Sequence, residues 1–196
     1  GRCLEPGLAP TLWPCIEIAR TLLAIDEAAG GAASRGDTGD GAPQANPWQR
    51  LAAGRQVATA TVELADHFVD LLHAAVERPG TTGCVVLVDD LHWADQATLD
   101  VLQLVLSRLG RGGVLVVAAH RPPELVPDSL LAAALAGLHR SVAAATRVPM
   151  APLDTPGVAE LIAATTGVAP SAELAERVQA RTSGNPLFVT ELARLA

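Results

Sequence analysis

The sequence predicts an α/β fold in which a parallel sheet with flanking helices is followed by a C-terminal helical subdomain. Two short apolar runs rich in β-branched residues, at 84–90 and 114–119, have the length and composition of strands. A helical pattern lies between them, and three helix starts follow residue 153. Because strands alternate with a helix across short loops, the sheet is expected to be parallel with right-handed crossovers.

Two helices are expected before the first strand. Pro14 suits the first turn of one of them. Its apolar stripe consists of Ile16, Ala19, Leu22 and Leu23. Apolar residues at helical spacing predict a second helix from about 56 to 77. Residues 28–47 lie between the two helices and are rich in Gly, Ala and Asp without periodicity, so we expect a flexible surface insertion there.

Both apolar runs are predicted to form strands buried on both faces, because helices normally cover each side of a parallel sheet. Cys84 opens the first run and is expected to pack as a small hydrophobic side chain. Asp95 is expected to cap the helix between the strands rather than to bind a ligand. The glycine-rich segment 110–113 should end that helix.

The region after the second strand is predicted to be mostly helical. An Ala- and Leu-rich helix is expected at 129–138, and a weaker edge strand at 146–150. Three further helices are expected. Asp154 should cap the first, the second should begin near Ser171, and Asn185 should cap the third.

Composition limits the classes of function. The net charge is -7 and no basic stripe is present, so this segment is not expected to bind DNA or RNA directly. The three cysteines are widely spaced and form no ligand pair, which favours a reducing cytoplasm. No apolar stretch has the length of a membrane span, and no signal peptide is recognisable. Because the chain begins with Gly1 and not Met, we expect it to be part of a longer polypeptide.

Two adjacent carboxylates, Asp89 and Asp90, stand at the tip of the first strand. Ligands of open α/β sheets bind beyond the carboxyl ends of the strands. There one carboxylate can hold Mg²⁺ and its neighbour can orient or deprotonate an attacking water. The alternative is a solvated turn in which an aspartate acts as a cap. Arg121 follows the second strand at the same edge, where it could contact a terminal phosphate or remain in solvent.

Three segments together carry a resemblance to a known family. They read VVLVDDLHWADQATLDVL, VLVVAAHRPPEL and RTSGNPLFVTELARL. The chain resembles, over nearly its whole length, the ATPase module of signal-transduction NTPases with numerous domains (STAND), which belong to the AAA+/P-loop superfamily. It is most similar to the large ATP-binding LuxR-type transcriptional regulators of bacteria.

The resemblance implies a role for each matching position. Asp89 would coordinate Mg²⁺ at the Walker B strand, and Asp90 would be the catalytic, water-orienting acid. Arg121 would act near the terminal phosphate as part of sensor 1. Gly184 and Pro186 would form the Gly-x-Pro element that packs near the adenine. The implied cofactors are ATP and Mg²⁺.

The resemblance also implies a domain organisation. Residues 1–152 would be an incomplete P-loop NTPase α/β domain containing the insertion, and residues 153–196 would begin a helical lid subdomain. The partners would be nucleotide and other domains of the same polypeptide, including a DNA-binding domain C-terminal to this chain. No membrane partner is implied.

The sequence departs from this family at one essential motif. A P-loop requires Gly-x-x-x-x-Gly-Lys-Ser/Thr, but all fourteen basic residues here are Arg and Lys is absent. We therefore expect a chain truncated after the Walker A segment that binds ATP poorly and does not hydrolyse it at a useful rate.

Two other functions remain open. The chain could be a degenerate, nucleotide-free interaction scaffold with the same fold. It could also be a metal-dependent hydrolase that uses the aspartate pair alone, although no cluster of ligands completes a two-metal site.

Overall fold

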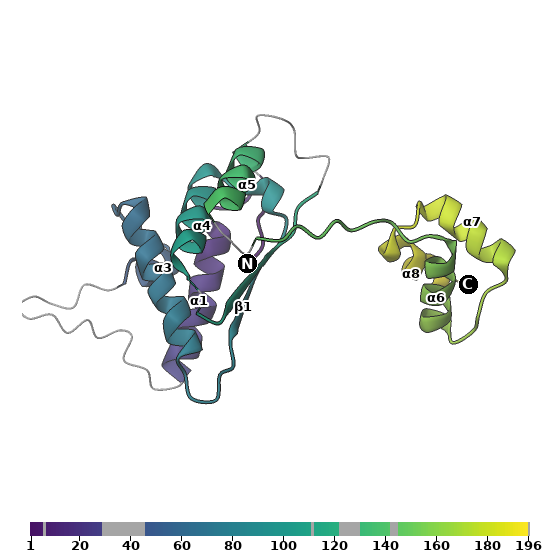
Figure 1. Cartoon of the computed structure of the whole chain (residues 1–196), viewed down its shortest axis with the longest axis horizontal. Helices are drawn as coiled ribbons and strands as arrows, with labels where there is room; N and C mark the ends of the chain where they lie inside the picture. Colours follow the sequence, from purple (N-terminus) through teal and green to yellow (C-terminus); the bar gives the residue numbers. More distant parts are fainter. Residues whose placement is uncertain (6, 29–45, 111, 122–129, 142–144, 196) are drawn as a thin grey trace, which may run out of the picture. The chain divides into compact units, whose positions relative to one another are not determined.

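The computed structural model describes residues 1–5, 7–28, 46–110, 112–121, 130–141 and 145–195 (Figure 1). The chain divides into two compact units, Gly1–Ala145 and Thr146–Ala196, and each is described by itself.

The first unit contains a parallel pair of strands, β1 (Cys84–Val88) and β2 (Val114–Ala118). Cys84 lies opposite Val114, and the register continues to the end of both strands. The helix α4 (Gln96–Arg108) makes the crossover between them. A mixed α/β fold with a parallel sheet and flanking helices is thus confirmed, as part of a P-loop NTPase fold.

The N-terminal residues extend this pairing beyond β1. Arg2 forms a parallel bridge with Asp89. The Asp89 N–H donates to the Gly1 carbonyl at 3.0 Å, and the Cys3 N–H donates to the Asp89 carbonyl at 2.9 Å. Residues 1–3 therefore lie along the edge of β1, beside the aspartate pair.

Helices pack on the sheet and on one another to form the core of the first unit. They are α1 (Trp13–Ala28), α2 (Pro47–Ala52), α3 (Thr61–Val76), α4 and α5 (Leu130–Ser141). Trp48 is completely buried, and its indole N–H donates to the Leu64 carbonyl at 2.9 Å. Its ring meets Phe68 edge-on at 5.1 Å, so the short helix α2 is anchored in the core by one aromatic side chain.

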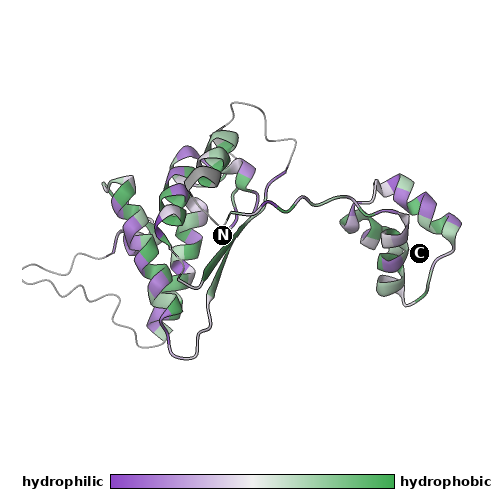
Figure 2. Cartoon of the chain, viewed as in Figure 1, coloured by the Kyte–Doolittle hydropathy of each residue, from purple (hydrophilic) through white to green (hydrophobic). Residues whose placement is uncertain are grey.

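The prediction that both strands are buried on both faces is wrong. Val86 and Val88 of β1 are buried against the helices. On the other face, four apolar side chains are between 42% and 69% exposed, namely Val85, Leu87, Leu115 and Val117. Figure 2 shows both strands in the hydrophobic colour. The reason is that the helices of the described region cover only one side of the sheet, while the strand sequence is apolar on both sides.

Several predicted boundaries differ from the observed ones. The helix expected from about 56 begins at Thr61. The sequence reading missed α2, in which Asn46 caps the helix by accepting from the Trp48 N–H at 2.9 Å. The expected insertion 28–47 is therefore too long at its ends, because Ala28 ends α1 and Pro47 begins α2. Its remaining residues, 29–45, lie outside the described part of the chain.

The second unit is a group of three helices, α6 (Thr155–Thr166), α7 (Ala172–Thr182) and α8 (Pro186–Arg194). Asp154 and Asn185 cap α6 and α8 as predicted, and α7 starts next to Ser171 as expected. The side chains of all three residues accept a backbone N–H of the first turn, so Ser171 is a cap as well. A small core lies between α6 and α8. It consists of Val158, Ile162, Val189 and Ala193.

The edge strand expected at 146–150 is absent. These residues have no strand structure, and Val148 and Met150 are 73% and 86% exposed. Among the described residues of the second unit no strand lies beside them, so residues 146–150 have no strand to pair with despite their β propensity. The predicted helix at 129–138 is α5, which starts at Leu130; residue 129 lies outside the described part.

No helix within the described ranges has the length and apolar character needed to cross a membrane.

The sheet face that the described residues leave exposed predicts self-association, because an exposed apolar face promotes intermolecular contact. Leu87→Gln should therefore raise the monomer fraction in sedimentation velocity without changing the circular dichroism spectrum. Val86→Gln is the matched control on the buried face and should destabilise the fold by about 3 kcal/mol. Equal sedimentation of wild type and Leu87→Gln across concentrations would contradict this prediction.

Candidate functional site

The aspartate pair stands where β1 turns away from the sheet. Asp89 is exposed, while Asp90 adopts the left-handed conformation with φ 52° and ψ 39°. The Asp90 N–H donates to Asp89 Oδ1 at 2.9 Å. Asp90 then leads into the short 3-10 helix η1 (Leu91–Trp93). The turn therefore gives the two carboxylates different surroundings although they are adjacent in sequence.

Arg2 compensates the charge of Asp90. Its Nε and Nη2 atoms lie 2.9 Å and 2.8 Å from Asp90 Oδ2, and the Asp90 side chain is only 13% exposed. The hydrogen bond to Asp90, and then its negative charge, raise the pKa of the Arg2 guanidinium. This ion pair is part of the reason why two carboxylates can stand side by side at the strand tip.

His92 lies on the other side of the same carboxylate. Its Nε2 is 3.9 Å from Asp90 Oδ1, and its side chain is 1% exposed. Within the described ranges neither ring nitrogen has a hydrogen-bond partner. The imidazole packs on the Trp93 ring at 4.8 Å between centroids. His92 is thus a buried member of the turn and not a loop side chain in solvent.

The end of β2 is tied to the same turn. The Ala119 N–H donates to the Val88 carbonyl at 2.9 Å, and the Leu91 N–H donates to the Ala119 carbonyl at 2.8 Å. The exposed Arg121 follows, and its guanidinium carbon lies 5.7 Å from the Trp93 ring centroid. His120 stands between Ala119 and Arg121 in the sequence, and its Nδ1 lies 3.4 Å from the Arg121 carbonyl oxygen. The structure therefore brings Arg121 to the turn that follows the aspartate pair.

Asp95 is a structural residue, as predicted. Its Oδ1 accepts from the Thr98 N–H at 2.7 Å and caps α4. Its Oδ2 accepts from the Leu12 N–H at 3.1 Å. Leu12 has a φ of 65°, which is uncommon for a branched residue and needs such external support. One carboxylate thus joins the helix α4 to the loop that precedes α1.

Gly184 and Pro186 lie in the second unit, so the structure describes them separately from the aspartate pair. Gly184 has a φ of +71°, and a Cβ there would meet the Leu153 carbonyl oxygen at 2.1 Å. The Leu153 N–H donates to the Gly184 carbonyl at 2.9 Å. Glycine is therefore required by both its conformation and its close backbone contact. Pro186 is the exposed first residue of α8.

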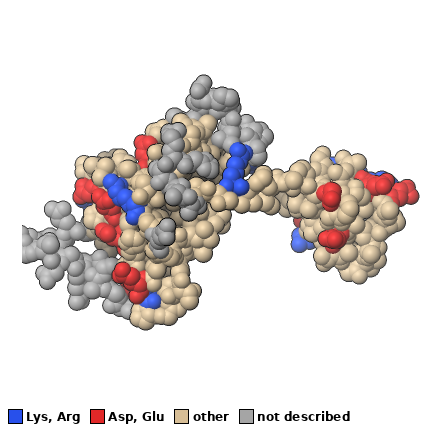
Figure 3. All heavy atoms as spheres, viewed as in Figure 1, with Lys and Arg blue, Asp and Glu red and all other residues tan. Residues whose placement is uncertain are grey.

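Surface charge shows no continuous basic region on the face drawn in Figure 3, where acidic side chains occur on both units. Among the described residues no group of three or more His, Cys, Asp and Glu side chains could enclose a metal ion. A cation at this site would therefore rely on one or two carboxylates and on oxygens from its own ligand.

Comparison with known families gives two matches. A family model described as an AAA ATPase domain matches residues 1–117, which is more than half of the chain. The chain belongs to this family. A second model, described as a domain of unknown function (DUF8739), matches residues 157–195. No curated protein and no solved structure matches the chain.

Membership of the AAA ATPase family implies nucleotide binding, usually with Mg²⁺. The match includes Asp89, Asp90 and Arg2, but it ends before Arg121. The exposed Asp89 carboxylate offers the hard oxygen that Mg²⁺ prefers. Asp90 is less available, because Arg2 already occupies one of its oxygens. The residues present therefore fit a magnesium ion at Asp89.

Sequence reasoning missed Arg2 as a residue of this site. Arg2 and Asp90 are separated by 88 positions, and no motif connects them. The contact becomes visible only when residues 1–3 pair with the end of β1. Burial of His92 was also not predicted, since a histidine in a short loop is more often in solvent.

The double role of Asp95 can be measured. Asp95→Ala should lower the free energy of unfolding by about 2 kcal/mol, since it removes a helix cap and a second backbone hydrogen bond. Asp95→Asn keeps a good capping residue, so it should lower the free energy of unfolding by only about half as much. Urea denaturation of the two variants followed by circular dichroism tests this order. Variants indistinguishable from wild type would show that neither bond matters.

Proposed function

We propose that this chain carries the Walker B, sensor 1 and Gly-x-Pro parts of an ATP-dependent switch in a multidomain bacterial signalling or transcriptional regulator of the STAND and LuxR type. One observation carries the proposal: the Asp89–Asp90 pair ends a parallel strand within the AAA ATPase match, and Arg121 reaches the same turn. Such a regulator would act in the cytoplasm and would bind its nucleotide there.

Each member of the site has a distinct task in this proposal. Asp89 holds the magnesium ion, which when bound neutralises charge on the phosphates. Asp90 is the catalytic acid that orients the attacking water, and it does so only after Arg2 has released its carboxylate. Arg121 contacts the terminal phosphate with its guanidinium.

Gly184 and Pro186 would act from the helical unit. The rigid start of α8 supports this, because Gly184 is fixed against Leu153 and Asn185 caps the helix through the Leu187 N–H at 3.0 Å. In the proposed switch Pro186 packs near the adenine. The nucleotide state then changes how the helical unit, residues 153–196, docks on the α/β domain, residues 1–152. Other domains of the polypeptide, including one that binds DNA, would read this change.

The phosphate cradle is the part that this sequence does not supply. No lysine is present, so no Gly-x-x-x-x-Gly-Lys-Ser/Thr loop can form from these residues. The chain by itself is therefore proposed to be a weak nucleotide binder and inactive as a hydrolase.

A nucleotide-free scaffold is the alternative, and the Arg2–Asp90 ion pair is the observation that favours it. A carboxylate held at 2.8 Å by a guanidinium is stabilised as a structural element without any metal or water. The two functions differ in one measurable property, because only the switch needs Asp89 to bind a divalent cation.

Cation binding is the direct test. Mn²⁺ is a suitable paramagnetic probe because it shares the oxygen preference of Mg²⁺. Electron paramagnetic resonance should show Mn²⁺ binding to wild type, with the signal of bound ion lost in Asp89→Asn. Arg2→Gln should strengthen binding, because it frees Asp90 and removes a positive charge. Exposed Glu63→Gln is the control. Binding that survives Asp89→Asn, or its absence in wild type, would support the scaffold.

Nucleotide affinity tests the other half of the proposal. Mg-ATP should bind this chain with a Kd weaker than roughly 1 mM. Without a P-loop, the proposed site residues are expected to supply less than about 4 kcal/mol of binding free energy. No phosphate release above background is expected in a coupled assay. Turnover that is abolished by Asp90→Asn would show that the chain needs no P-loop lysine.

A further inference from the structure

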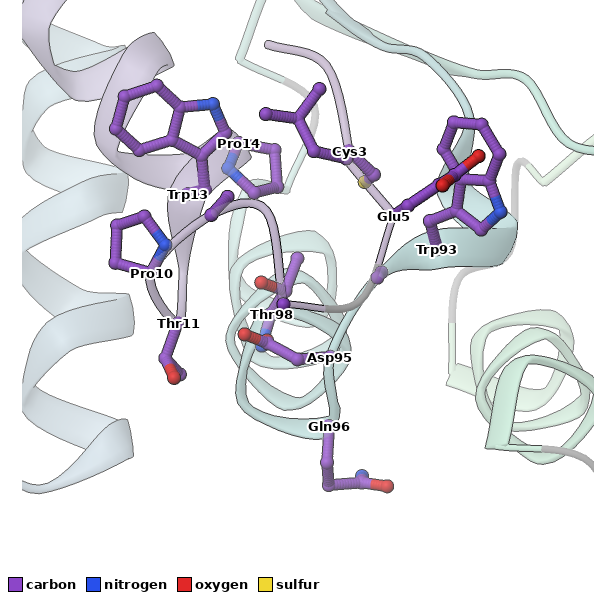
Figure 4. A pocket seen from close by; sticks show the side chains of 14 residues that line it. Cys3, Glu5, Pro10, Thr11, Trp13, Pro14, Trp93, Asp95, Gln96 and Thr98 are labelled. Carbon is purple, nitrogen blue, oxygen red and sulfur yellow. The ribbon is translucent and has the colours of Figure 1, made fainter.

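A cavity of about 460 Å³ lies against the segment Trp93–Asp95, which follows the aspartate turn, and none of the residues assigned to the proposed function lines it (Figure 4). Its described walls come from two parts of the chain that are distant in sequence: residues within 3–5 and 7–14, and residues within 93–98. Trp13 and Trp93 stand on opposite sides of it in Figure 4, with Asp95 between them at the base. The volume and the aromatic walls are those of small-molecule sites.

Hydrogen bonds hold both walls in place. Asp95 joins them directly, because it caps α4 and also accepts from the Leu12 N–H. Pairing of Cys3 with Asp89 fixes the start of the first wall, and Leu8 donates from its backbone to the Glu5 carbonyl at 3.0 Å.

The lining carries negative charge and no positive side chain. The charged residues among those that line it are Glu5 and Asp95. An anion entering the cavity would meet repulsion from these two carboxylates. The thiol of Cys3 is neutral near pH 7, because burial first, and then the carboxylates of Asp95 and Asp90, raise its pKa to about 11.

The two tryptophans already contact cations. The Arg20 guanidinium carbon lies 5.3 Å from the Trp13 ring, and that of Arg121 lies 5.7 Å from Trp93. Neither arginine lines the cavity. Indole rings attract cations and pack against other aromatic rings, so a compound with both an aromatic ring and a cationic group suits both the walls and the carboxylates.

We infer that this cavity is a binding site for a small aromatic cation, an arylalkylammonium compound, seated between Trp13 and Trp93 with its charge toward Glu5. This site is separate from the aspartate pair and does not depend on the proposed nucleotide chemistry.

Phenethylammonium is the probe, with phenethyl alcohol and phenylpropionate as neutral and anionic counterparts. The readout is the indole N–H signals of the three tryptophans in ¹H–¹⁵N spectra. Trp48 is the internal control, because its indole is completely buried and bonded to Leu64. The ammonium should shift the Trp13 and Trp93 signals and leave Trp48 unchanged. The expected Kd is on the order of millimolar for so small a ligand.

Charge and aromatic contact are tested separately. The ammonium should bind about fivefold more tightly than the alcohol, and the carboxylate more weakly than either. Glu5→Gln, at an exposed position that should leave the fold intact, should reduce the preference for the cation to less than about twofold. The matched control Glu63→Gln should leave it unchanged. Trp13→Leu should weaken binding of the cation by about fivefold.

Three outcomes would overturn the inference. They are no shift of the Trp13 and Trp93 signals, equal affinity for the cation and the carboxylate, and a charge preference that survives Glu5→Gln. None of these depends on Mn²⁺ or ATP.

Discussion

Backbone pairing at the carboxyl end of β1 is the constraint on which the rest of the first unit depends. On one edge, residues 1–3 bond to both backbone groups of Asp89; on the other, Ala119 bonds to Val88 and Leu91. A strand end held from both sides cannot fray, so the turn at Asp90 keeps its left-handed conformation. The positions of the carboxylates, of η1 and of the cavity wall all follow from that fixed turn.

The same pairing decides the electrostatics of the site. Because it places Arg2 beside Asp90, one carboxylate of the pair is compensated and the other, Asp89, faces solvent. Two equivalent carboxylates would repel each other and favour protonation of one of them. In the proposed switch, this asymmetry leaves Asp89 as the cation ligand while Asp90 stays paired with Arg2. Any chemistry at Asp90 must then include the loss of a charge-assisted hydrogen bond, which links activity to movement of the N-terminal segment.

The parts of the structure that could be predicted from sequence are those determined by local contacts. Asp95 and Asn185 were identified as caps because the bonded N–H lies two or three residues away. Burial of both sheet faces and a strand at 146–150 were predicted wrongly, since each depends on whether another element lies alongside. Asp89 was recognisable as a candidate from its position after an apolar run. Arg2 was not, because its relation to Asp90 exists only in three dimensions.

Trp93 connects the two proposed sites. Its ring forms one wall of the cavity and also contacts Arg121 and His92. A ligand in the cavity that holds the Trp93 ring in place would also hold the Arg121 guanidinium that contacts it. Conversely, a phosphate that draws Arg121 away would leave the Trp93 ring more mobile. Coupling of this kind is reciprocal, so the effect of the cavity ligand on phosphate affinity must equal the effect of phosphate on the ligand. The sign follows from geometry: Arg121 held on Trp93 is less available to phosphate, and the two ligands should oppose each other.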